Sequence, residues 1–599
     1  MALHFENISK VFNGKAVLQN ISGQIDRGEK IGLIGVNGVG KTTLVKILAG
    51  LEKSDQGSIR CTNAALRILY LEQYPAFTAG LSVYDELLKT LLAAESGQAF
   101  RLDANSAMAK ALNSAVEKAL NTVGLGKEVW TQPAQDLSGG EKTKLMLCRV
   151  LVSDYDLLIL DEPTNHLDLE SSQWLEDYLS KLNKTLVVIS HDRFFLDVVA
   201  NKIWELTPKG LQGYVGNYSA YKVQKENEIK NLTKEYSKQQ SKIQSLENMI
   251  AQRHNWYARA HKAAGQNDFY RAKAKKHAGV LKAKERELER LKSNQMDKPE
   301  KGLSPAFEII NKNIELKKLP PVLVRIENLT KAFGSKEILR DVSLQIRRED
   351  KIALLGANGT GKTTLLQIII GLDREYEGSL AINPQVRIGY FAQELSTLNY
   401  NATILEDVLN VGVKVNEARL LLASLLFKGD EVYKSISRLS MGERCRVAFA
   451  KLILAGANLL VLDEPTNYMD IISKEKIEEV LEEFQGSVIF VSHDRYFTQR
   501  IANKIYLIKN KAVQCYEGNY AYYLTKSQEE RGAAAQDDDS PIIRDKISRL
   551  EVELALLSSK LAEPLDEEAR AFLNAEFLRV AREINNYKEA LQKLQLRNC

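Results

Sequence analysis

The sequence predicts an α/β fold in which one domain occurs twice, with a helical hairpin between the two copies and another after the second. Three observations lead to this prediction: a long internal repeat, short apolar strand-like runs in each copy, and helical periodicity outside them. The length of 599 residues agrees with it, because one domain usually holds about 150 residues. We therefore expect a chain of several structural units.

The internal repeat sets the organisation of the chain. GVNGVGKTT at 35–43 returns as GANGTGKTT 321 residues later, whereas LLILDEPTNHLD at 157–168 returns as LLVLDEPTNYMD only 302 residues later. The first copy therefore contains an insertion of roughly 20 residues, which we place in the Ala-rich, helix-prone stretch around 90–115.

Domain boundaries follow from the repeat. We expect domain one at 1–221, a linker at 222–322, domain two at 323–525 and a tail at 526–599. Each domain alternates apolar runs such as KIGLI and TLVVIS with helical patterns, which is typical of a mainly parallel sheet flanked by helices.

Composition and charge narrow the class of protein. The chain is 44% hydrophobic and 27% charged, as expected for a globular protein. No apolar run approaches the roughly 20 residues of a membrane-spanning helix, and the N-terminus lacks the pattern of a signal peptide, so we expect a cytoplasmic protein. The cysteines show no C-x-x-C pair and are expected to be reduced and structural; they are Cys61, Cys148, Cys445, Cys515 and Cys599.

A glycine-rich segment in each copy fits the pattern G-x-x-x-x-G-K-[ST] between an apolar strand and a helix. In this pattern backbone N–H groups wrap the phosphates of a nucleotide, the lysine reaches the β- and γ-phosphates, and the hydroxyl binds Mg²⁺. A glycine turn without a ligand poorly explains two matches in the same context. The predicted residues are Gly35, Asn37, Gly38, Gly40, Lys41, Thr42, Thr43, Gly356, Asn358, Gly359, Gly361, Lys362, Thr363 and Thr364.

Two adjacent carboxylates end an apolar strand in each copy, Asp161 with Glu162 and Asp463 with Glu464. We predict that the aspartate holds Mg²⁺ and that the glutamate orients and deprotonates the attacking water. Strands also end in acidic residues that are merely solvated. The flanking PTN and the downstream SHD in both copies favour the catalytic interpretation.

Histidine and glutamine residues are weaker candidates. His191 and His493 each lie 30 residues after the aspartate. A lone histidine after a strand is more often structural, but the matched spacing favours a hydrogen bond to the γ-phosphate. Gln73 and Gln393, in YLEQ and YFAQ, end strands where a polar side chain is often only solvated.

LSGGE and LSMGE each open a helical pattern, with Ser138 and Ser440 as N-caps and Glu141 and Glu443 three residues later. A capping box alone explains this spacing. The functional alternative is that the serine hydroxyl, the glycine amides and the positive helix end bind a phosphate presented by a partner domain.

These motifs in this order resemble the ATP-binding-cassette superfamily. Two cassettes in one chain, with a helical linker of about a hundred residues and no membrane segment, resemble its ABC-F subfamily of soluble, ribosome-associated ATPases. The resemblance implies two P-loop ABC ATPase domains that hydrolyse ATP with Mg²⁺, paired within a monomer. We refer to 1–221 as the first cassette and to 323–525 as the second.

The resemblance also implies two ATP molecules held head to tail between the cassettes. Site 1 would join the first P-loop, Gln73, Glu162 and His191 to the second signature, Ser440 and Gly442. Site 2 would join the second P-loop, Gln393, Glu464 and His493 to the first signature. The further residues that the resemblance assigns are the first signature (Ser138, Gly139, Gly140), the Mg²⁺ ligands (Thr42, Gln73, Asp161, Thr363, Gln393, Asp463) and the adenine-stacking rings (Phe12, Phe333).

One position departs from the family pattern. Met441 in LSMGE replaces a glycine whose amide approaches the γ-phosphate. A side chain therefore stands where close backbone approach is required, and we expect site 1 to be the slower or weaker site.

Helical periodicity predicts a hairpin in the linker. Apolar residues spaced by three and four run from Ile229 to Ile250 and again from Leu281 to Leu291, and GQND at 265–268 interrupts them. We expect two antiparallel helices with a tip near 260–270. The seam positions are Ile229, Leu232, Tyr236, Gln239, Ile243, Leu246, Ile250, Leu281, Leu288 and Leu291.

The linker is strongly basic. Residues 222–302 contain 20 Lys and Arg against 10 Asp and Glu, in a chain whose net charge is +5. Charged coiled-coil faces are usually only solvated, but near the tip the cations alternate with Trp256, Tyr257, Phe269 and Tyr270, which favours RNA. Alternatively, these rings close the hairpin end or pack on a cassette. The predicted RNA-binding residues are Arg253, Trp256, Arg259, Lys262, Arg271, Lys273, Lys275 and Lys276.

The tail is predicted to be a flexible joint, AAAQDDDSP at 533–541, followed by a second helical hairpin. Two heptad runs, 547–561 and 580–594, flank EPLDEE. Their mixed charge leaves a nucleic-acid contact and a purely structural coiled coil open.

The resemblance implies that the chain binds rRNA and tRNA in the tRNA exit region of the ribosome, as a translation factor or as an antibiotic-resistance ribosomal protection protein. The resemblance favours protection, because family members of that kind tend to have a small insertion and a long linker. The alternatives are the energy subunit of an ABC transporter and a DNA-binding repair-associated ATPase. Double-cassette importers lack a basic hairpin of this length, and a repair role rests only on the coiled coils and the charge.

Overall fold

The computed structural model describes most of the chain and falls into two compact units. The larger comprises Met1–Ala502 and Tyr506–Cys515, and the smaller comprises Asn503–Ile505 and Tyr516–Cys599. The described residues are 3–61, 66–73, 77–95, 107–164, 167, 169–263, 268–294, 307–312, 319–392, 398–536, 546, 550, 554, 573 and 575–588.

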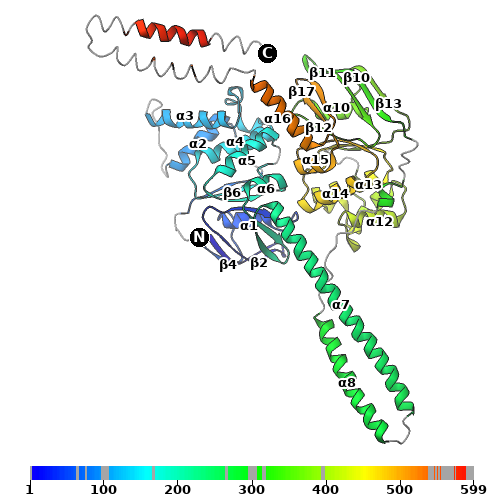
Figure 1. Ribbon diagram of the computed structural model, residues 1–599. Helices are drawn as coiled ribbons and strands as arrows, with labels where there is room; N and C mark the ends of the chain where they lie inside the picture. Colours follow the sequence, from blue (N-terminus) through cyan, green and yellow to red (C-terminus); the bar gives the residue numbers. More distant parts are fainter. Residues whose placement is uncertain are drawn as a thin grey trace. The chain divides into compact units, whose positions relative to one another are not determined.

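The first cassette contains two sheets, as the apolar runs predicted (Figure 1). A three-stranded antiparallel sheet has the order β2-β1-β4, and a six-stranded sheet has the order β5-β6-β7-β3-β8-β9, with β9 antiparallel to β8. The strands are β1 (Leu3–Phe12), β2 (Lys15–Ile25), β3 (Lys30–Ile34), β4 (Gln56–Cys61), β5 (Ile68–Leu71), β6 (Leu157–Asp161), β7 (Thr185–Ile189), β8 (Lys202–Thr207) and β9 (Gly210–Val215).

The second cassette repeats this topology. Its three-stranded sheet has the order β11-β10-β13 and its six-stranded sheet the order β14-β15-β16-β12-β17-β18. The strands are β10 (Val322–Phe333), β11 (Lys336–Arg347), β12 (Lys351–Leu355), β13 (Glu377–Ile382), β14 (Ile388–Phe391), β15 (Leu459–Asp463), β16 (Ser487–Val491), β17 (Lys504–Lys509) and β18 (Ala512–Tyr516).

Both faces of each six-stranded sheet are buried, which explains why its strands are continuously apolar. On β6, Leu157 and Ile159 belong to the core shared with the three-stranded sheet and α1, whereas Leu158 and Leu160 belong to the core beneath the helices of the opposite face. The helices of the first cassette are α1 (Lys41–Leu48), α2 (Val83–Glu95), α3 (Ala107–Thr122), α4 (Gly139–Val152), α5 (Leu169–Lys181) and α6 (Arg193–Val199).

Parallel register brings the predicted motifs to one edge. Asp161 on β6 pairs with Ile189 on β7, and Ile189 pairs with Leu33 on β3. The P-loop, Glu162 and His191 follow the carboxyl ends of these three strands, the edge at which open α/β sheets bind ligands.

The predicted insertion corresponds to longer helices in the first cassette. α2 and α3 have 13 and 16 residues, whereas α11 (Ile404–Leu409) and α12 (Val415–Ser424) have 6 and 10. The segment at 96–106, in the middle of the predicted insertion, lies outside the described residues. The other helices of the second cassette are α10 (Lys362–Ile369), α13 (Met441–Leu454), α14 (Ile471–Glu483) and α15 (Arg495–Ile501).

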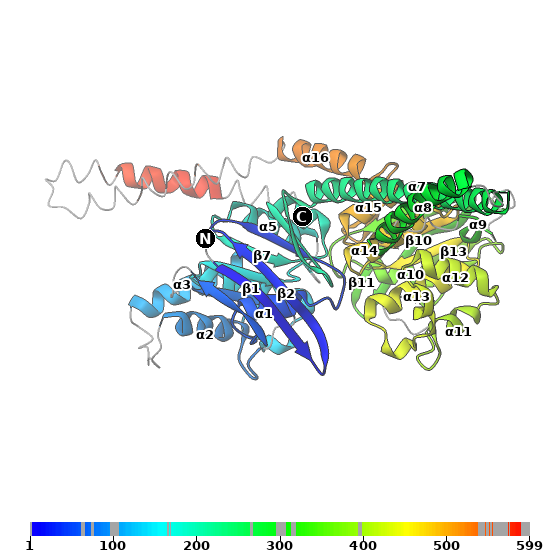
Figure 2. The same ribbon diagram turned by 90° about the horizontal axis from the view of Figure 1, so that it is seen from below.

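The linker forms the predicted hairpin of two antiparallel helices, α7 (Tyr218–Ala263) and α8 (Asp268–Ser293), which lie side by side in both views (Figures 1 and 2). Ile243, Leu246 and Leu281 are buried in the seam between them, where interlocking apolar side chains stabilise paired helices. A short helix, α9 (Phe307–Ile310), follows.

The seam is shorter than its periodicity predicted. Ile229 and Leu232 are 36% and 45% exposed, because α7 is 46 residues long and α8 only 26. The side-chain amide of Gln239 donates to the carbonyl of Asn294 at 2.9 Å, just beyond the end of α8. The prediction that Ile229 and Leu232 belong to the seam is therefore wrong, since they precede the paired segment.

The tail prediction is partly wrong and partly confirmed. α16 (Tyr520–Gln536) includes the AAAQ of the expected joint, because alanine and glutamine favour helix; 537–541 lie outside the described residues. Val580 and Ile584 are buried. They pack against the earlier heptad residues Leu550 and Leu554 and against Tyr587, so the two heptad runs contact each other as expected.

Two further predictions concern membrane-spanning helices and cysteines in the described ranges. No helix there is both long and apolar enough to span a bilayer. Cys148 and Cys445 are buried, whereas Cys61 and Cys515 are exposed, and none of the four forms a disulfide. The structural role expected of the cysteines therefore fits Cys148 and Cys445 but not the two exposed cysteines.

Candidate functional site

The two P-loops have the same conformation. Each follows a central strand, and its last glycine caps the next helix with a positive φ, +106° at Gly40 and +96° at Gly361. A Cβ at Gly40 would lie 2.9 Å from Val17 Cγ1, and a Cβ at Gly361 would lie 2.6 Å from Ile338 Cγ2. Only glycine fits there, and the helix N–H groups stay accessible to a phosphate.

The P-loop lysines are buried and folded over their own loops. Lys41 Nζ donates to two loop carbonyls at 2.8 and 3.2 Å, and Lys362 Nζ donates to the equivalent carbonyls at 2.9 Å each. Both ammonium groups therefore lie in the concave side of the loop. The remaining predicted loop residues lie in the same two segments: Gly35, Asn37, Gly38, Thr43, Gly356, Asn358, Gly359 and Thr364.

The residues predicted to hold Mg²⁺ fit that ion. Burial raises the pKa of Asp161 and of Asp463, and the nearby hydroxyls of Thr42 and Thr363 act against it by favouring the charged form of each carboxylate. Asp463 Oδ2 is buried and has no hydrogen-bond partner among the described residues, whereas Asp161 Oδ2 accepts from Tyr70 at 3.3 Å. One hydroxyl and one carboxylate suit Mg²⁺, which takes its other ligands from phosphates and water.

Glu162 and Glu464 adopt a strained backbone conformation, with φ of +51° and +48°. Such values are rare outside glycine and often mark functional positions. The Glu162 N–H donates to Ile189 O at 2.9 Å and the Glu464 N–H donates to Val491 O at 3.0 Å. Burial raises the pKa of each carboxyl to about 7, a value suited to taking a proton from water.

The histidines contact these glutamates. His191 Nε2 lies 3.3 Å from Glu162 Oε1 and 3.1 Å from Asn37 Oδ1, and His493 Nε2 lies 3.5 Å from Glu464 Oε1. Burial lowers the pKa of His191 well below its ordinary value, so its imidazole is neutral. The histidine, the glutamate and the P-loop asparagine thus meet at one point of site 1.

Both signature serines form the predicted capping boxes. Ser138 Oγ accepts from the Glu141 N–H at 3.4 Å, and Ser440 Oγ accepts from the Glu443 N–H at 3.3 Å. Each glutamate in turn accepts from its serine's N–H, at 2.9 and 2.8 Å. Capping is confirmed, and phosphate binding by the serines stays a prediction. The signature glycines Gly139, Gly140 and Gly442 lie in the first turns of α4 and α13.

A cavity of about 600 Å³ lies at site 2, within the range of small-molecule sites. The second P-loop with Glu464 and His493 forms one wall, and the first signature with Thr164 and Ser172 forms another. The cavity also extends to His191 and Lys474 at the interface between the cassettes. Phe333, the predicted adenine-stacking ring of this site, also lines the cavity. The two halves of site 2 therefore face each other across the space, as the head-to-tail arrangement requires.

At site 1 the first P-loop touches the second cassette directly. The Asn37 N–H donates to Asp470 Oδ2 at 3.0 Å, and Asn37 Nδ2 donates to Tyr468 O at 3.1 Å. A Cβ at Gly442 would lie 2.9 Å from Tyr468 O, so the signature glycine is also tightly packed. Met441 is 43% exposed. Sites 1 and 2 therefore have the same motifs, but the two cassettes contact each other directly at site 1 and enclose a cavity at site 2.

For the other residues predicted to contact the nucleotide, the structure gives less detail. Phe12 is 44% exposed, with Lys10 Nζ 5.1 Å from its ring centroid. Gln73 lies beside a cavity of about 20 Å³ that also touches Asp161 and Glu162. Gln393 lies outside the described residues.

The predicted RNA-binding residues cluster near the hairpin tip along the backbone of α7 and α8. Arg253 and Arg259 are exposed. For the rest the structure describes the helix but not the side chain: Trp256, Lys262, Arg271, Lys273, Lys275 and Lys276.

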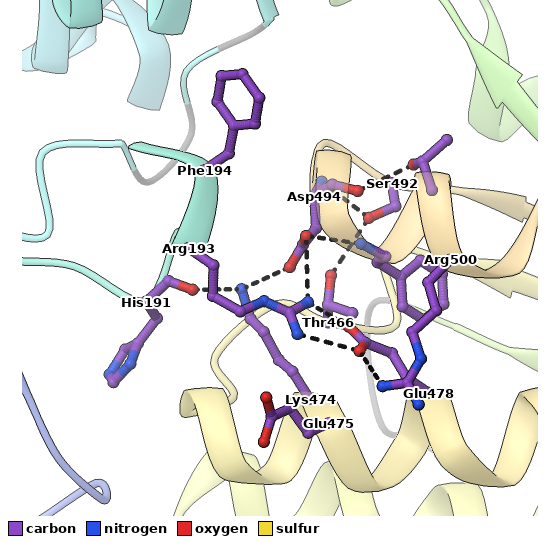
Figure 3. Close-up of polar contacts among 12 residues, drawn as sticks. His191, Arg193, Phe194, Thr466, Lys474, Glu475, Glu478, Ser492, Asp494 and Arg500 are labelled. Atoms are coloured by element: carbon purple, nitrogen blue, oxygen red, sulfur yellow. Dashed lines mark hydrogen bonds and ion pairs between the residues drawn. The ribbon is translucent and has the colours of Figure 1, made fainter. Parts of the chain in front are cut away.

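The contacts that join the cassettes were not predicted. Arg193, at the start of α6, makes two hydrogen bonds to Glu478 of α14, and Arg495 Nη1 donates to Glu176 of α5 at 3.0 Å. Figure 3 shows Arg193 and Glu478 facing each other. The repeated HDR at 191–193 and 493–495 was the available signal, because a buried cation needs a partner.

Comparison with known families matches both cassettes and the linker. Residues 18–165 and 339–467 match the family described as ABC transporter. Residues 204–309 match a second family with the same description.

Curated relatives match over most of their length. "ABC transporter F family member 5" of Arabidopsis thaliana is 33% identical over 566 residues, covering 88% of this chain and 78% of the relative. "Ribosome protection protein VmlR" of Bacillus subtilis is 33% identical over 516 residues, covering 85% of this chain and 87% of the relative.

A solved structure of "RNase-L Inhibitor" aligns with a TM-score of 0.56 at 19% identity, covering 86% of this chain and 90% of that one, which supports the twin α/β fold. The motifs in both cassettes and the F-family relatives agree. The chain belongs to the ABC-F family of ATP-binding-cassette proteins and is an ATPase.

Proposed function

We propose that this ATPase binds the ribosome in the tRNA exit region, and that ATP-driven closure of its cassettes presents the linker hairpin to rRNA or tRNA. The relative described as a ribosome protection protein, 33% identical over 516 residues, supports this target. The basic linker supports RNA as the ligand, since clustered Lys and Arg neutralise phosphates.

The observation that carries the proposal is the junction between the hairpin and the second cassette. Tyr218 and Lys222, in the first turns of α7, both reach Glu475 of α14, with Tyr218 Oη at 3.4 Å and Lys222 Nζ at 2.9 Å from Glu475 Oε1. α7 itself continues from β9 of the first cassette. A helix anchored to both cassettes must change its direction when they move relative to each other.

A second contact strengthens that junction. Tyr496, at the start of α15, donates a hydrogen bond to Asp197 of α6, and its hydroxyl lies 3.3 Å from Ser219 Oγ of α7. Ser219 Oγ donates to Asp197 Oδ2 at 2.6 Å. The residues that follow both histidine motifs therefore meet at the first turn of the hairpin.

The proposed chemistry at each site uses the chain's own residues as follows. Bound Mg²⁺ would neutralise charge on the β- and γ-phosphates, held by Thr42 and Asp161 at site 1 and their counterparts at site 2. Glu162 and Glu464 accept a proton from the attacking water. The neutral His191 imidazole orients the γ-phosphate and the glutamate, and the P-loop lysines hold the phosphates.

Co-sedimentation with ribosomes tests the proposal. The double variant Glu162→Gln, Glu464→Gln keeps the shape of both sites but removes the proton acceptors, so ATP should hold the cassettes closed. We expect this variant to pellet with ribosomes in ATP and to be released in ADP. Failure to pellet in ATP, with ATP binding intact, would refute ribosome binding.

The role on the ribosome can be separated by a growth assay. A ribosomal protection protein should raise the inhibitory concentration of a ribosome-targeting antibiotic in a sensitive host, and the Gln variants should not. A translation factor should instead alter elongation on stalling messages without changing drug sensitivity.

A further inference from the structure

The interface between the cassettes contains two related arginine–glutamate pairs. Arg193 with Glu478 and Arg495 with Glu176 are equivalent through the 302-residue offset. In each pair an arginine Nη1 lies 3.0 Å from a glutamate oxygen, and all four side chains are buried. Repeated sequence alone would make the two halves of this interface equal.

Lys474 breaks that equivalence. Its Nζ donates to the main-chain carbonyl of His191 at 3.1 Å and to Asp494 Oδ2 at 3.1 Å, and Figure 3 shows it lying between them. The equivalent position in the first cassette is Ser172. Because a serine side chain is three atoms shorter, it cannot make the matching bridge to the second histidine motif.

The surrounding charges show the same imbalance. Asp192 and Asp494 each follow a histidine and cap the next helix. Burial, with repulsion from Asp494, raises the pKa of Asp192. Burial also acts on Asp494, but Lys474 and Arg193 outweigh it and hold the pKa of that carboxyl below its ordinary value.

The half of the interface that contains Lys474 is also the better paired half. Glu478 accepts hydrogen bonds from Arg193 and, at 2.9 Å, from Arg500. In the other half two atoms, Arg495 Nη2 and Glu176 Oε1, are buried without a hydrogen-bond partner in the described part of the chain, against one, Arg193 Nε, in the half that contains Lys474. The tighter half borders site 1, because α14 follows the loop that binds Asn37.

We propose that Lys474 is a positioning residue for site 1. Its ammonium group ties the His191 carbonyl of the first cassette to Asp494 of the second, and so holds the His191 imidazole against Glu162 and Asn37. This role rests on the proposed head-to-tail pairing of the cassettes. It gives site 1 a bridge that site 2 lacks.

The test measures hydrolysis at each site separately in the full-length chain. Glu464→Gln leaves site 1 to hydrolyse, and Glu162→Gln leaves site 2. Adding Lys474→Ser, which copies the residue of the first cassette, should slow single-turnover hydrolysis at site 1 by about 10-fold or more, since small misplacements of catalytic groups are costly. Lys474 also lines the site 2 cavity, so hydrolysis at site 2 should change as well, but by less than at site 1, and ATP affinity at site 1 should be kept.

Two further variants complete the experiment. Lys476→Ser, two residues along α14, removes a lysine that pairs with Glu479 of the same helix and should leave both rates unchanged. Lys474→Gln keeps most of the side-chain length if Lys474→Ser fails to fold, and should still slow site 1 more than site 2. Equal losses at both sites, or no loss in either Lys474 variant, would overturn the proposal.

Failure of the proposed function would look different. It would appear in the chains that retain Lys474, as an absence of ATP-dependent ribosome binding. The site-specific rates are measured without ribosomes and therefore report on Lys474 alone.

Discussion

At site 1 the first P-loop binds the second cassette through Asn37, whereas at site 2 the equivalent surfaces enclose a cavity of about 600 Å³. The P-loop lysines, the strained glutamates and the capped serines make matching local contacts in the two cassettes. The difference comes from residues that the repeat does not share. Identical catalytic motifs therefore do not ensure identical sites, because the interface around them decides how easily each site opens.

Residue differences at three equivalent positions account for much of the difference between site 1 and site 2. Lys474 replaces Ser172, Arg500 replaces Val198, and Met441 replaces Gly139. The first two add cations to the half of the interface that borders site 1. We expect the two added cations to make site 1 the slowly exchanging site, and Met441 to make it the slowly hydrolysing site.

The largest expected difference concerns the two buried glutamates. Glu478→Gln should lower the free energy of unfolding by about 3 kcal/mol, because it removes the charge of a fully buried carboxylate that Arg193 and Arg500 share. Glu176→Gln should cost about 1 kcal/mol, since Glu176 makes one hydrogen bond to Arg495. Chemical unfolding of both variants measures this, and equal costs would contradict the inequality of the two halves.

An intermediate effect is expected for the P-loop asparagines. Asn37→Ala removes the side-chain contacts to Tyr468 O and His191 Nε2, each worth about 1 kcal/mol. Release of a fluorescent ATP analogue from site 1 should then be about 10-fold faster in the Glu162→Gln, Glu464→Gln background.

Asn358→Ala is the matched control. Asn358 lines the site 2 cavity, and its removal should accelerate release from site 2 by less than Asn37→Ala accelerates release from site 1. A similar acceleration in both variants would show that Asn37 does not hold site 1 closed.

The smallest effect is expected at the signature. Met441→Gly should raise hydrolysis at site 1 by about 3-fold, because glycine permits closer approach of the helix N–H groups to the γ-phosphate. Gly139→Met places the same side chain at site 2 and should lower hydrolysis there by a similar factor. Single-turnover rates check both, and a loss at site 1 in Met441→Gly would refute this role.

Local sequence patterns predicted most of the fold and the motif geometry. The P-loops, the capping boxes and the strand ends depend on a few neighbouring residues, so their spacing in the sequence was sufficient. The predicted hairpin seam was too long because it included Ile229 and Leu232, since periodicity cannot show where the partner helix ends. AAAQ was likewise predicted to be part of a flexible joint, but its high helix propensity extends α16 through it.

Local sequence patterns could not predict the interface between the cassettes. Arg193 and Glu478 lie 285 residues apart, and Asn37 and Asp470 lie 433 apart. A buried arginine requires a partner, but the sequence does not identify which carboxylate provides it. The unequal closure of the sites arises from such long-range contacts.

Single-turnover hydrolysis with one working site at a time tests the central claim most directly. With Glu464→Gln only site 1 hydrolyses ATP, and with Glu162→Gln only site 2 does so. Because Met441 keeps the signature N–H groups of site 1 from approaching the γ-phosphate closely, we predict that its rate constant is about 3-fold lower than that of site 2. Equal rate constants, or faster hydrolysis at site 1, would contradict the account.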